Sequence, residues 1–443
     1  MTEAPKEKTT ATKSTEMAKK VRGMVKTMYQ RTHEAKAQGQ PIIYSFLGSQ
    51  TDEIMRAMDI IPVYPENYAG LCAAKQDAER FLIKAQSEGF SNNLCTYAMC
   101  GLGFDVMRRE LGEMPLNSPD GGMERPDAML GLGMDICDPR YKWFQSVQRY
   151  MDVPMHVIGL LWPPFDANIK EVEQYYVDYM FEELRNVVEF MQRVTGRQLD
   201  LDRLSYLIDI SDETDRTRYE AYQLRKAVPA VMPTQDAMNT MVPAGFLRGT
   251  EEALNFYKEL YKELKYRVDN KIGVIPNEKY RILWGGGLPP WFALSIFNYF
   301  ENLGAVFPIE GAYRPPMPVE IPARVTHPLE RLAWRHFRRV TPKHTEAMNH
   351  SGVPEVEFLL EMIEDYRIDA VVWHRAVTCR TLHIGQMHEL NVLKQYRDLP
   401  CLILESDIVD VRSFDKIGTE NKIDSFIEMI ENFKKDKGVK NDI

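Results

Sequence analysis

The sequence predicts an α/β protein in which two parallel-sheet units are joined by helices. Short apolar runs rich in β-forming residues alternate with segments of helical periodicity near both ends of the chain. Strands that alternate with helices form parallel sheets, because each crossover helix returns the chain to the same edge of the sheet. A helix-rich middle separates the two alternating regions.

The first alternating region follows an N-terminal stretch without periodicity. Residues 1 to about 18 are predicted to be a mobile arm, and a helix is predicted over 24–37. Helical spacing recurs over 52–60 and around 141–150. Apolar runs that end in glycine or polar residues predict buried strands. These strands are residues 41–48, 127–133 and 155–161.

The middle and the second region continue this pattern. Apolar residues spaced by three and four positions predict amphipathic helices over 169–195 and around 254–264. A last helix is predicted over 422–435. Four further apolar runs predict strands at 281–287, 305–310, 369–374 and 401–406.

Chain length sets the expected domain organisation. The chain has 443 residues, which suggests two or three domains at roughly 150 residues each. We expect an N-terminal arm and helix over 1–40, a first α/β domain with a helical extension over 41–235, and a second α/β domain over 236–443.

Composition excludes several classes of protein. Lys and Arg number 55 against 64 Asp and Glu, so the net charge is −9, which disfavours a general nucleic-acid binder. The sequence contains no apolar run of the roughly 18 residues that a membrane-spanning helix needs. The polar N-terminus lacks the apolar core of a secretory signal, so a cytoplasmic location is expected.

Common catalytic motifs are absent from the sequence. It has no phosphate loop, no G-x-G-x-x-G between a strand and a helix, no G-x-S-x-G elbow and no H-E-x-x-H. We therefore expect that the chain does not hydrolyse ATP by itself. Residues 285–287, all glycine, follow a predicted strand. They form either a ligand-facing loop or a tight turn.

The placement of three cysteines suggests a ligand site. Cys137 and Cys379 directly follow the predicted strands 127–133 and 369–374, and Cys95 lies in a loop that enters a predicted helix. Ligands of open α/β sheets bind at the carboxyl ends of the strands. Thiolates suit iron–sulfur clusters, and helix N-termini and Arg380 would stabilise their charge.

The alternative is that the cysteines are small buried hydrophobic residues. Cys401 fits this alternative best, because it opens a predicted strand. Cys72 and Cys100 fit either interpretation: each is a core residue or a substitute ligand.

Several segments together resemble one family, the iron–sulfur subunits of 2-hydroxyacyl-CoA dehydratases and ATP-dependent benzoyl-CoA reductases. The resemblance runs from Phe46 to the C-terminus and implies two Rossmann-like parallel-sheet domains with a [4Fe–4S] cluster between them. It also implies that Cys95, Cys137 and Cys379 hold the cluster and leave one iron open. The similar segments are YPENYAGLC, LCTYAMCGLGF, DICDPRYKWFQSVQRYMDVP, ILWGGGLPPWF, LERLAWRHF, DAVVWHRAVTCRTLHIGQ and LPCLILESDIVDVR.

The resemblance also implies partners. Family members work with a homologous second iron–sulfur subunit and with an ATP-hydrolysing activator whose own [4Fe–4S] cluster supplies electrons. That arrangement is consistent with the missing phosphate loop in this chain. The implied substrate is an aromatic acyl-CoA, and no nucleic acid or membrane takes part.

Two reactions share this scaffold. The dehydratases, which are lyases, expel water from a 2-hydroxyacyl-CoA through a ketyl radical. The benzoyl-CoA reductases, which are oxidoreductases, reduce the aromatic ring to a cyclic dienoyl-CoA. The chain length and the blocks DAERFLIKAQSEGF and LILESDIVDVR look more like the larger active-site subunit of the reductase. Further hypotheses are a non-catalytic scaffold that holds a cluster for its partner and a cluster-free binding protein.

Supporting residues each have a structural alternative. His374 is a candidate catalytic residue or a buried strand-end histidine, and Glu66 is a candidate acid/base or a helix N-terminal carboxylate. Ser49 and Gln50 are candidates for substrate binding or loop capping. Trp291 and Trp334 line an acyl-CoA pocket or belong to the core.

Overall fold

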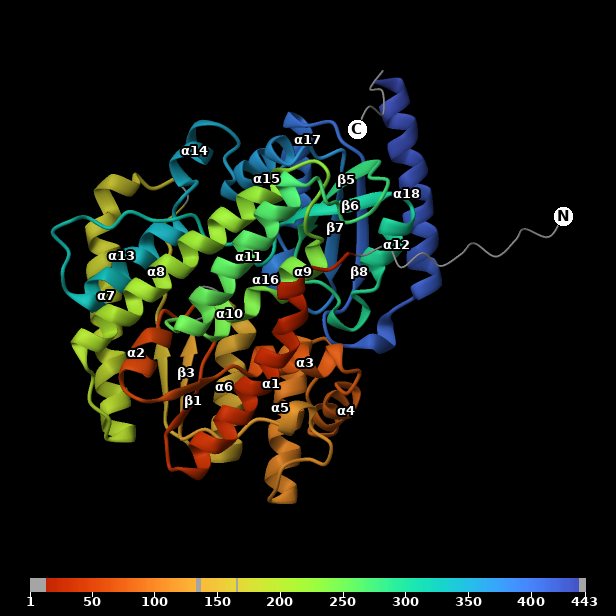
Figure 1. Cartoon of the computed structure of the whole chain (residues 1–443). Helices are drawn as coiled ribbons and strands as arrows, with labels where there is room; N and C mark the ends of the chain where they lie inside the picture. Colours follow the sequence, from red (N-terminus) through yellow and green to blue (C-terminus); the bar gives the residue numbers. More distant parts are fainter. Residues whose placement is uncertain (1–12, 133–136, 165, 438–443) are drawn as a thin grey trace.

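The structure, a computed structural model, describes residues 13–132, 137–164 and 166–437. It is an α/β protein with two parallel sheets, as the sequence predicted, and one sheet lies below the other in Figure 1. Each sheet has four strands. The strands of the first sheet, in spatial order, are β2 (Ile61–Val63), β1 (Ile42–Tyr44), β3 (Ala128–Leu132) and β4 (Met155–Ile158). Those of the second sheet are β6 (Ala305–Glu310), β5 (Tyr280–Gly286), β7 (Ala370–Ala376) and β8 (Cys401–Ser406).

Helices connect the strands and cover the sheets. The helices of the first part are α1 (Glu16–Ala37), α2 (Asp52–Ala57), α3 (Pro65–Ala74), α4 (Glu79–Ser87), α5 (Thr96–Leu111), α6 (Asp138–Met151) and α7 (Ile169–Thr195). Those of the middle are α8 (Leu201–Gln223), α9 (Thr234–Asn239), α10 (Met241–Phe246) and α11 (Glu251–Asp269). Those of the last part are α12 (Ile296–Asn302), α13 (Pro328–Val340), α14 (His344–Asn349), α15 (Pro354–Asp365), α16 (Arg380–His383), α17 (Gln386–Tyr396) and α18 (Lys416–Asp436).

Most predicted elements occur close to their predicted bounds. The strands at 305–310 and 401–406 and the helix at 169–195 have the bounds that the sequence predicted. Strand β2 was not predicted, because three residues that include Pro62 carry no periodicity. The last residue of the predicted strand 127–133 lies outside the described residues.

The N-terminal helix begins earlier than predicted. Helix α1 starts at Glu16 rather than at residue 24, so residues 16–18 of the predicted arm are helical. Thr15 caps the helix by accepting a hydrogen bond from the N–H of Ala18. Asp236 holds Thr15 in place by accepting its backbone N–H at 2.6 Å. Residues 1–12 of the predicted arm lie outside the described residues.

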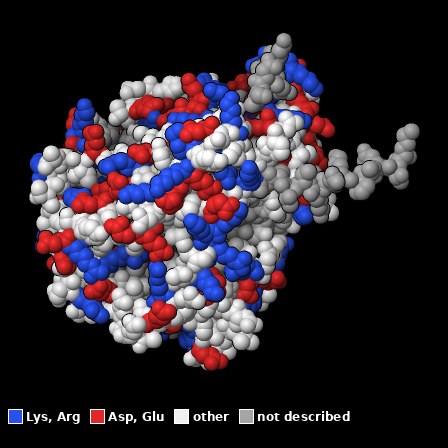
Figure 2. Space-filling view, in the orientation of Figure 1, with Lys and Arg blue, Asp and Glu red and all other residues white. Residues whose placement is uncertain are grey.

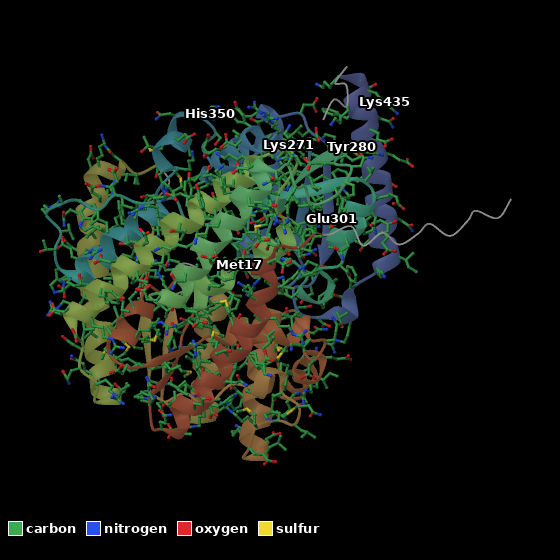
Figure 3. All side chains as sticks on the ribbon, viewed as in Figure 1. Met17, Lys271, Tyr280, Glu301, His350 and Lys435 are labelled. Carbon is green, nitrogen blue, oxygen red and sulfur yellow. The ribbon has the colours of Figure 1, made fainter. Side chains whose placement is uncertain are left out.

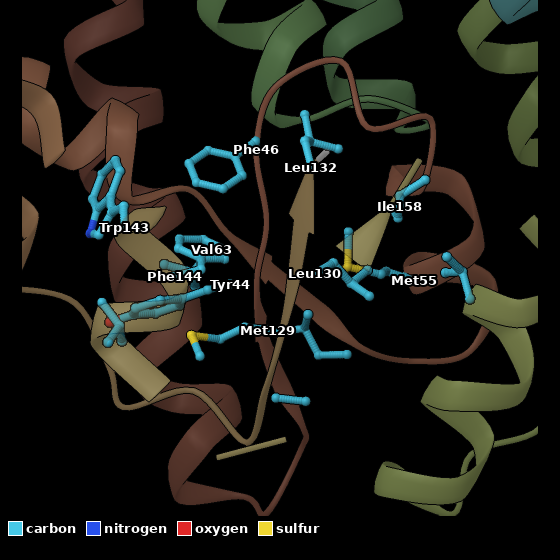
Figure 4. Close-up of a cluster of buried hydrophobic side chains, with 14 of the residues drawn as sticks. Tyr44, Phe46, Met55, Val63, Met129, Leu130, Leu132, Trp143, Phe144 and Ile158 are labelled. Atoms are coloured by element: carbon cyan, nitrogen blue, oxygen red, sulfur yellow. The ribbon is translucent and has the colours of Figure 1, made fainter. Parts of the chain in front are cut away.

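The first sheet packs into an aromatic core (Figure 4). Phe46, which follows β1, stacks on Phe144 of α6 with 4.1 Å between ring centroids, and Trp143 packs edge-on against both rings. The strands β1 and β3 are buried along their whole length. This packing fixes the position of α6 and therefore of Cys137, which directly precedes that helix.

Two helices pack against a sheet that is distant from them in sequence. Helix α13 follows residue 236, yet Leu332 and Trp334 belong to the core of the first sheet. Trp334 is buried in this core, which agrees with the second of the two interpretations given for it above. Helix α1 packs Met17 (Figure 3) into the second core and Tyr29 into the first. The two units therefore share helices, and the boundary at 235/236 stays a prediction.

Charge on the molecular surface is mixed. Figure 2 shows basic and acidic side chains interspersed over the visible face. Within the described residues, none of the helices combines the length and the apolar character that crossing a membrane requires.

Candidate functional site

Each of the three predicted cysteine ligands occupies the same position relative to a helix. Cys95, Cys137 and Cys379 are the N-cap residues of α5, α6 and α16, and all three are half-buried. None of the thiols forms a capping hydrogen bond. Burial raises the pKa of each thiol, and the backbone N–H group three residues further along each helix partly opposes this by favouring the thiolate.

The three thiols come together in one site. Burial raises the pKa of all three and brings that of Cys379 to about 11. A further cause is mutual: the Cys379 and Cys137 thiolates raise the pKa of Cys95, and the Cys137 thiolate raises that of Cys379. The fold thus brings two cysteine loops of the first unit to the loop after β7 of the second.

A single buried carboxylate joins the Cys95 and Cys379 loops. The hydroxyl of Thr96 donates to Asp407 Oδ1 at 2.6 Å, and the hydroxyl of Thr378 donates to Oδ2 of the same carboxylate. Asp407 also accepts the backbone N–H groups of Val409 and Asp410, both at 2.8 Å. Asp407 is only 1% exposed. Each threonine adjoins a cysteine, so these bonds fix the separation of two predicted ligands.

A second tie joins the Cys137 and Cys379 loops. Arg380 forms an ion pair with Asp138, and these residues directly follow Cys379 and Cys137. The hydroxyl of Thr381 lies near Cys137 and lowers the pKa of its thiol. Every cysteine of the site is therefore connected to another through a neighbouring residue.

Glu66 lies beside the thiols in a two-bond ion pair. Arg140 donates to its carboxylate through Nε at 2.9 Å and Nη2 at 2.7 Å. Arg140 also donates to the carbonyl of Leu47 at 3.3 Å, which ties the loop after β1 to the site. The Arg140 charge lowers the pKa of Cys137, whereas the Glu66 charge raises the pKa of that thiol.

Aromatic side chains border the same site. The Trp291 indole donates to the hydroxyl of Tyr97, whose helix begins at the Cys95 loop. Its ring lies 5.9 Å from that of Tyr313. Burial raises the pKa of Tyr313, and the Glu66 and Cys379 charges raise it further. Tyr313 has a left-handed backbone with φ 61°, which is costly for an aromatic residue and frequent at functional sites.

Ser49 and Gln50 lie in the loop that Arg140 contacts. The hydroxyl of Ser49 is buried and bonded to those of Ser45 and Thr51, which favours the loop-capping alternative. Gln50 differs, because its Oε1 is buried without a hydrogen-bond partner among the described residues. A substrate donor would satisfy this oxygen.

His374 is enclosed by protein contacts. Its Nδ1 donates to the carbonyl of Leu288 at 2.7 Å, and its Nε2 bonds the hydroxyl of Ser406 at 2.8 Å. Burial lowers the pKa of the ring to about 3, so His374 is neutral. These contacts favour a buried strand-end histidine, and a catalytic role for His374 stays a prediction.

The other cysteines lie in different surroundings. Cys72 and Cys100 are fully buried in the first core, where burial and then the neighbouring Cys100 thiol raise the pKa of Cys72. Cys401 opens β8, as the sequence predicted, and its thiol donates to the carbonyl of Leu399 at 3.4 Å.

Several residues of the site were not identified from the sequence. Arg140, Thr96 and Thr378 lie within three positions of a predicted ligand, and that proximity was the available signal. Asp407 and Tyr313 follow β8 and β6 by one and three positions, respectively. Placement beyond a strand end was the only signal for those two.

The site fits an iron–sulfur cluster. Three mutually repelling thiolates in a buried space are unfavourable alone, and bound metal supplies the compensating positive charge. No His, Cys, Asp or Glu side chains among the described residues are grouped so as to hold a single metal ion. A four-iron cluster makes a different demand, because each thiolate binds a different iron and the thiols stand farther apart.

Fold and site define an α/β protein of two parallel sheets whose loops bring three helix-capping thiols together. The chain belongs to the family of the 2-hydroxyglutaryl-CoA dehydratase D-component, whose family model matches residues 50–430.

Similar proteins carry out more than one reaction. The alpha subunit of lactoyl-CoA dehydratase from Anaerotignum propionicum is 23% identical over 413 residues, which cover 91% of this chain and 93% of that protein. A benzoyl-CoA reductase subunit from Thauera aromatica is 22% identical over 428 residues, with 93% and 94% covered. The (R)-2-hydroxyisocaproyl-CoA dehydratase alpha subunit of Clostridioides difficile is 24% identical over 423 residues, with 94% and 96% covered.

Proposed function

We propose that this chain is the active-site subunit of a cytoplasmic enzyme that acts on acyl-CoA thioesters, and that Cys95, Cys137 and Cys379 hold a [4Fe–4S] cluster with one open iron. The observation that carries the proposal is the meeting of three N-cap thiols from both halves of the chain. Asp407 and the Asp138–Arg380 ion pair support it, because they fix the three loops relative to one another.

The cluster, when bound, supplies one-electron chemistry to the thioester. The chain positions the substrate and limits the access of water. Trp291 and Tyr313 offer apolar faces beside the thiols, and the unpartnered Oε1 of Gln50 accepts a hydrogen bond from the substrate. Glu66 keeps Arg140 in place beside Cys137, and we propose that it acts by positioning.

Within this function, we propose ATP-dependent reduction of the aromatic ring of benzoyl-CoA or a substituted benzoyl-CoA. The sequence blocks that resemble the larger reductase subunit support this choice, as does the similarity to the Thauera aromatica reductase chain along nearly the whole sequence. The proposed partners are a homologous iron–sulfur subunit and an ATP-hydrolysing [4Fe–4S] activator.

A second candidate is dehydration of a (R)-2-hydroxyacyl-CoA. The specific observation that favours it is the similarity to lactoyl-CoA and 2-hydroxyisocaproyl-CoA dehydratase subunits, which covers 91% and 94% of this chain. The same three cysteines would hold the same cluster, so the two candidates differ in substrate and product rather than in the metal site.

One experiment separates the candidates. The chain, purified anaerobically with its partner subunit and reduced activator, would receive ATP and, in separate reactions, benzoyl-CoA or a 2-hydroxyacyl-CoA, and products would be identified by mass spectrometry. A dienoyl-CoA heavier by two hydrogen atoms supports the reductase. Loss of water from phenyllactyl-CoA or hydroxyglutaryl-CoA, without ring reduction, supports the dehydratase. Iron that stays bound while neither substrate reacts would favour a scaffold subunit. Cys379→Ser should abolish turnover, and Cys401→Ala serves as the matched control.

A further inference from the structure

A large cavity lies between the two halves of the chain. Its volume is about 1200 Å³, and the segment 314–323, with proline at four positions, forms one wall. The ends of α8 and α13 and one side of α15 form the others. Sites for drug-sized ligands measure roughly 300–1,000 Å³, so this cavity accommodates a ligand of coenzyme size.

Arg314 is a cation without a partner in this cavity. Its guanidinium stacks on Phe358, 3.6 Å from the ring centroid, and it has no ion pair or hydrogen bond among the described residues. Burial lowers its pKa to about 10, and Glu355 and Glu361 only partly oppose this. A half-buried, unpaired guanidinium is costly, and an anionic ligand would remove that cost.

The other Lys and Arg side chains that line the cavity differ from Arg314, because each has a carboxylate partner in the described part of the chain. The pairs are Lys226 with Asp365, Lys343 with Glu361, Arg338 with Glu173 and Arg339 with Asp215.

A second polar group of the cavity also lacks a partner. His344 is 6% exposed, lines the cavity, and has a buried Nδ1 without a hydrogen-bond partner among the described residues. Buried ring nitrogens are normally satisfied, so this atom indicates a missing ligand group. Two unpartnered groups, one of them cationic, thus line the same space.

The cavity adjoins the cysteine site. Tyr313, the residue before Arg314, packs against Trp291, and the Cys379 charge acts on its hydroxyl. Arg218 of α8 donates to the carbonyl of Tyr313 and so holds this segment in place. The cavity wall and the border of the cysteine site are therefore formed by neighbouring residues of one segment, Tyr313 and Arg314.

We propose that this cavity binds the phosphate-bearing part of an acyl-CoA thioester, with Arg314 and His344 holding a phosphate group. The inference rests on the proposed function, because that function supplies the thioester. Its chemistry follows from the cavity: room for a coenzyme, proline and aromatic walls, and an unpaired cation and an unpaired ring nitrogen among the lining residues.

Isothermal titration of the full chain, purified anaerobically, tests the proposal with coenzyme A and pantetheine as probes. Arg314→Gln should weaken coenzyme A binding by about tenfold or more, which is the effect of losing one charge-assisted contact. It should leave pantetheine binding unchanged. Arg314→Lys keeps the charge, so its affinity for coenzyme A should lie between those of the wild type and Arg314→Gln. It provides the test if the glutamine variant does not fold. Arg185→Gln, in an exposed pair with Glu182, is the matched control.

Equal binding of coenzyme A by wild type and Arg314→Gln would overturn the proposal, and so would an absence of coenzyme A binding to the wild type. Turnover measurements distinguish a failure of the cavity assignment from a failure of the proposed function. If the assembled enzyme converts acyl-CoA and Arg314→Gln leaves KM unchanged, the cavity assignment fails while the function stands. If coenzyme A binding depends on Arg314 but no acyl-CoA reacts, the function fails and the cavity assignment stands.

Discussion

The hydroxyl groups of Thr96 and Thr378 lie 3.3 Å apart although 282 positions separate the two residues in the chain. Both donate to the carboxylate of Asp407. Because each threonine adjoins a cysteine of the candidate site, this contact sets how far apart Cys95 and Cys379 are held.

Asp407→Asn should destabilise the junction of the two halves. An amide keeps one acceptor oxygen and loses the other, so one threonine hydroxyl and its buried surroundings lose a partner. We expect a loss of about 1–3 kcal/mol in the free energy of unfolding, measured by urea denaturation. Iron retention after anaerobic gel filtration should also fall. Glu405→Gln, in an exposed pair with Arg375, should change stability by about 0.5 kcal/mol or less. Unchanged iron retention in Asp407→Asn would argue against a role in spacing the ligands.

Serine substitution at Cys95, Cys137 or Cys379 should remove the cluster. Iron and sulfide would be assayed after anaerobic reconstitution, with about four irons per chain expected for the wild type. Cys401→Ala should retain iron and cost about 1–2 kcal/mol of packing stability. Loss of iron in Cys401→Ala together with its retention in Cys137→Ser would show that the ligand assignment is wrong.

Glu66→Gln should lower the pKa values of the site thiols. The Glu66 charge raises the pKa of Cys95, Cys137 and Cys379, so its removal favours the thiolates. The largest fall is expected at Cys137, because the Arg140 charge beside it would no longer be neutralised by Glu66. The alkylation rate of each thiol in the iron-free chain, followed by mass spectrometry at a fixed pH, should increase. Glu182→Gln, a surface change, should leave these rates unaltered.

His374 should make the protein less stable in mild acid. Its folded pKa of about 3 lies below the value of about 6.5 for an exposed histidine, so the unfolded chain binds more protons between these values. The contribution of neutral His374 to the free energy of unfolding is fully present above about pH 6.5 and declines as the pH falls toward 3. Between about pH 7.5 and pH 5 the loss should be about 2 kcal/mol.

Urea unfolding of wild type and His374→Asn at these two pH values measures the effect. The variant should be less stable at the higher pH but lose less on acidification. His336, whose pKa burial lowers to about 4, contributes a similar background in both proteins. An identical pH dependence in the two proteins would contradict the burial of a neutral His374.

Local sequence patterns were sufficient for seven of the eight strands of the two sheets. Apolar runs and helical spacing depend on neighbouring residues, so strands such as β6 and β8 and the helix α7 could be predicted from them. Strand β2 could not, because its three residues are too few to carry a period. The sequence also supplied the resemblance to the family and the candidate cysteines, which were identified by their placement beside predicted strands and helices.

Only the tertiary structure decided which groups meet. Asp407 joins Thr96 to Thr378, and Arg140 pairs with Glu66 across 74 positions, through contacts between loops of different elements. Burial likewise assigned Trp334 to the core and enclosed His374. Such contacts depend on where the sheets and their crossover helices place the loops, and no local periodicity records that placement. The sequence alone therefore determined the elements and the candidate ligands, and long-range packing determined the site built around them.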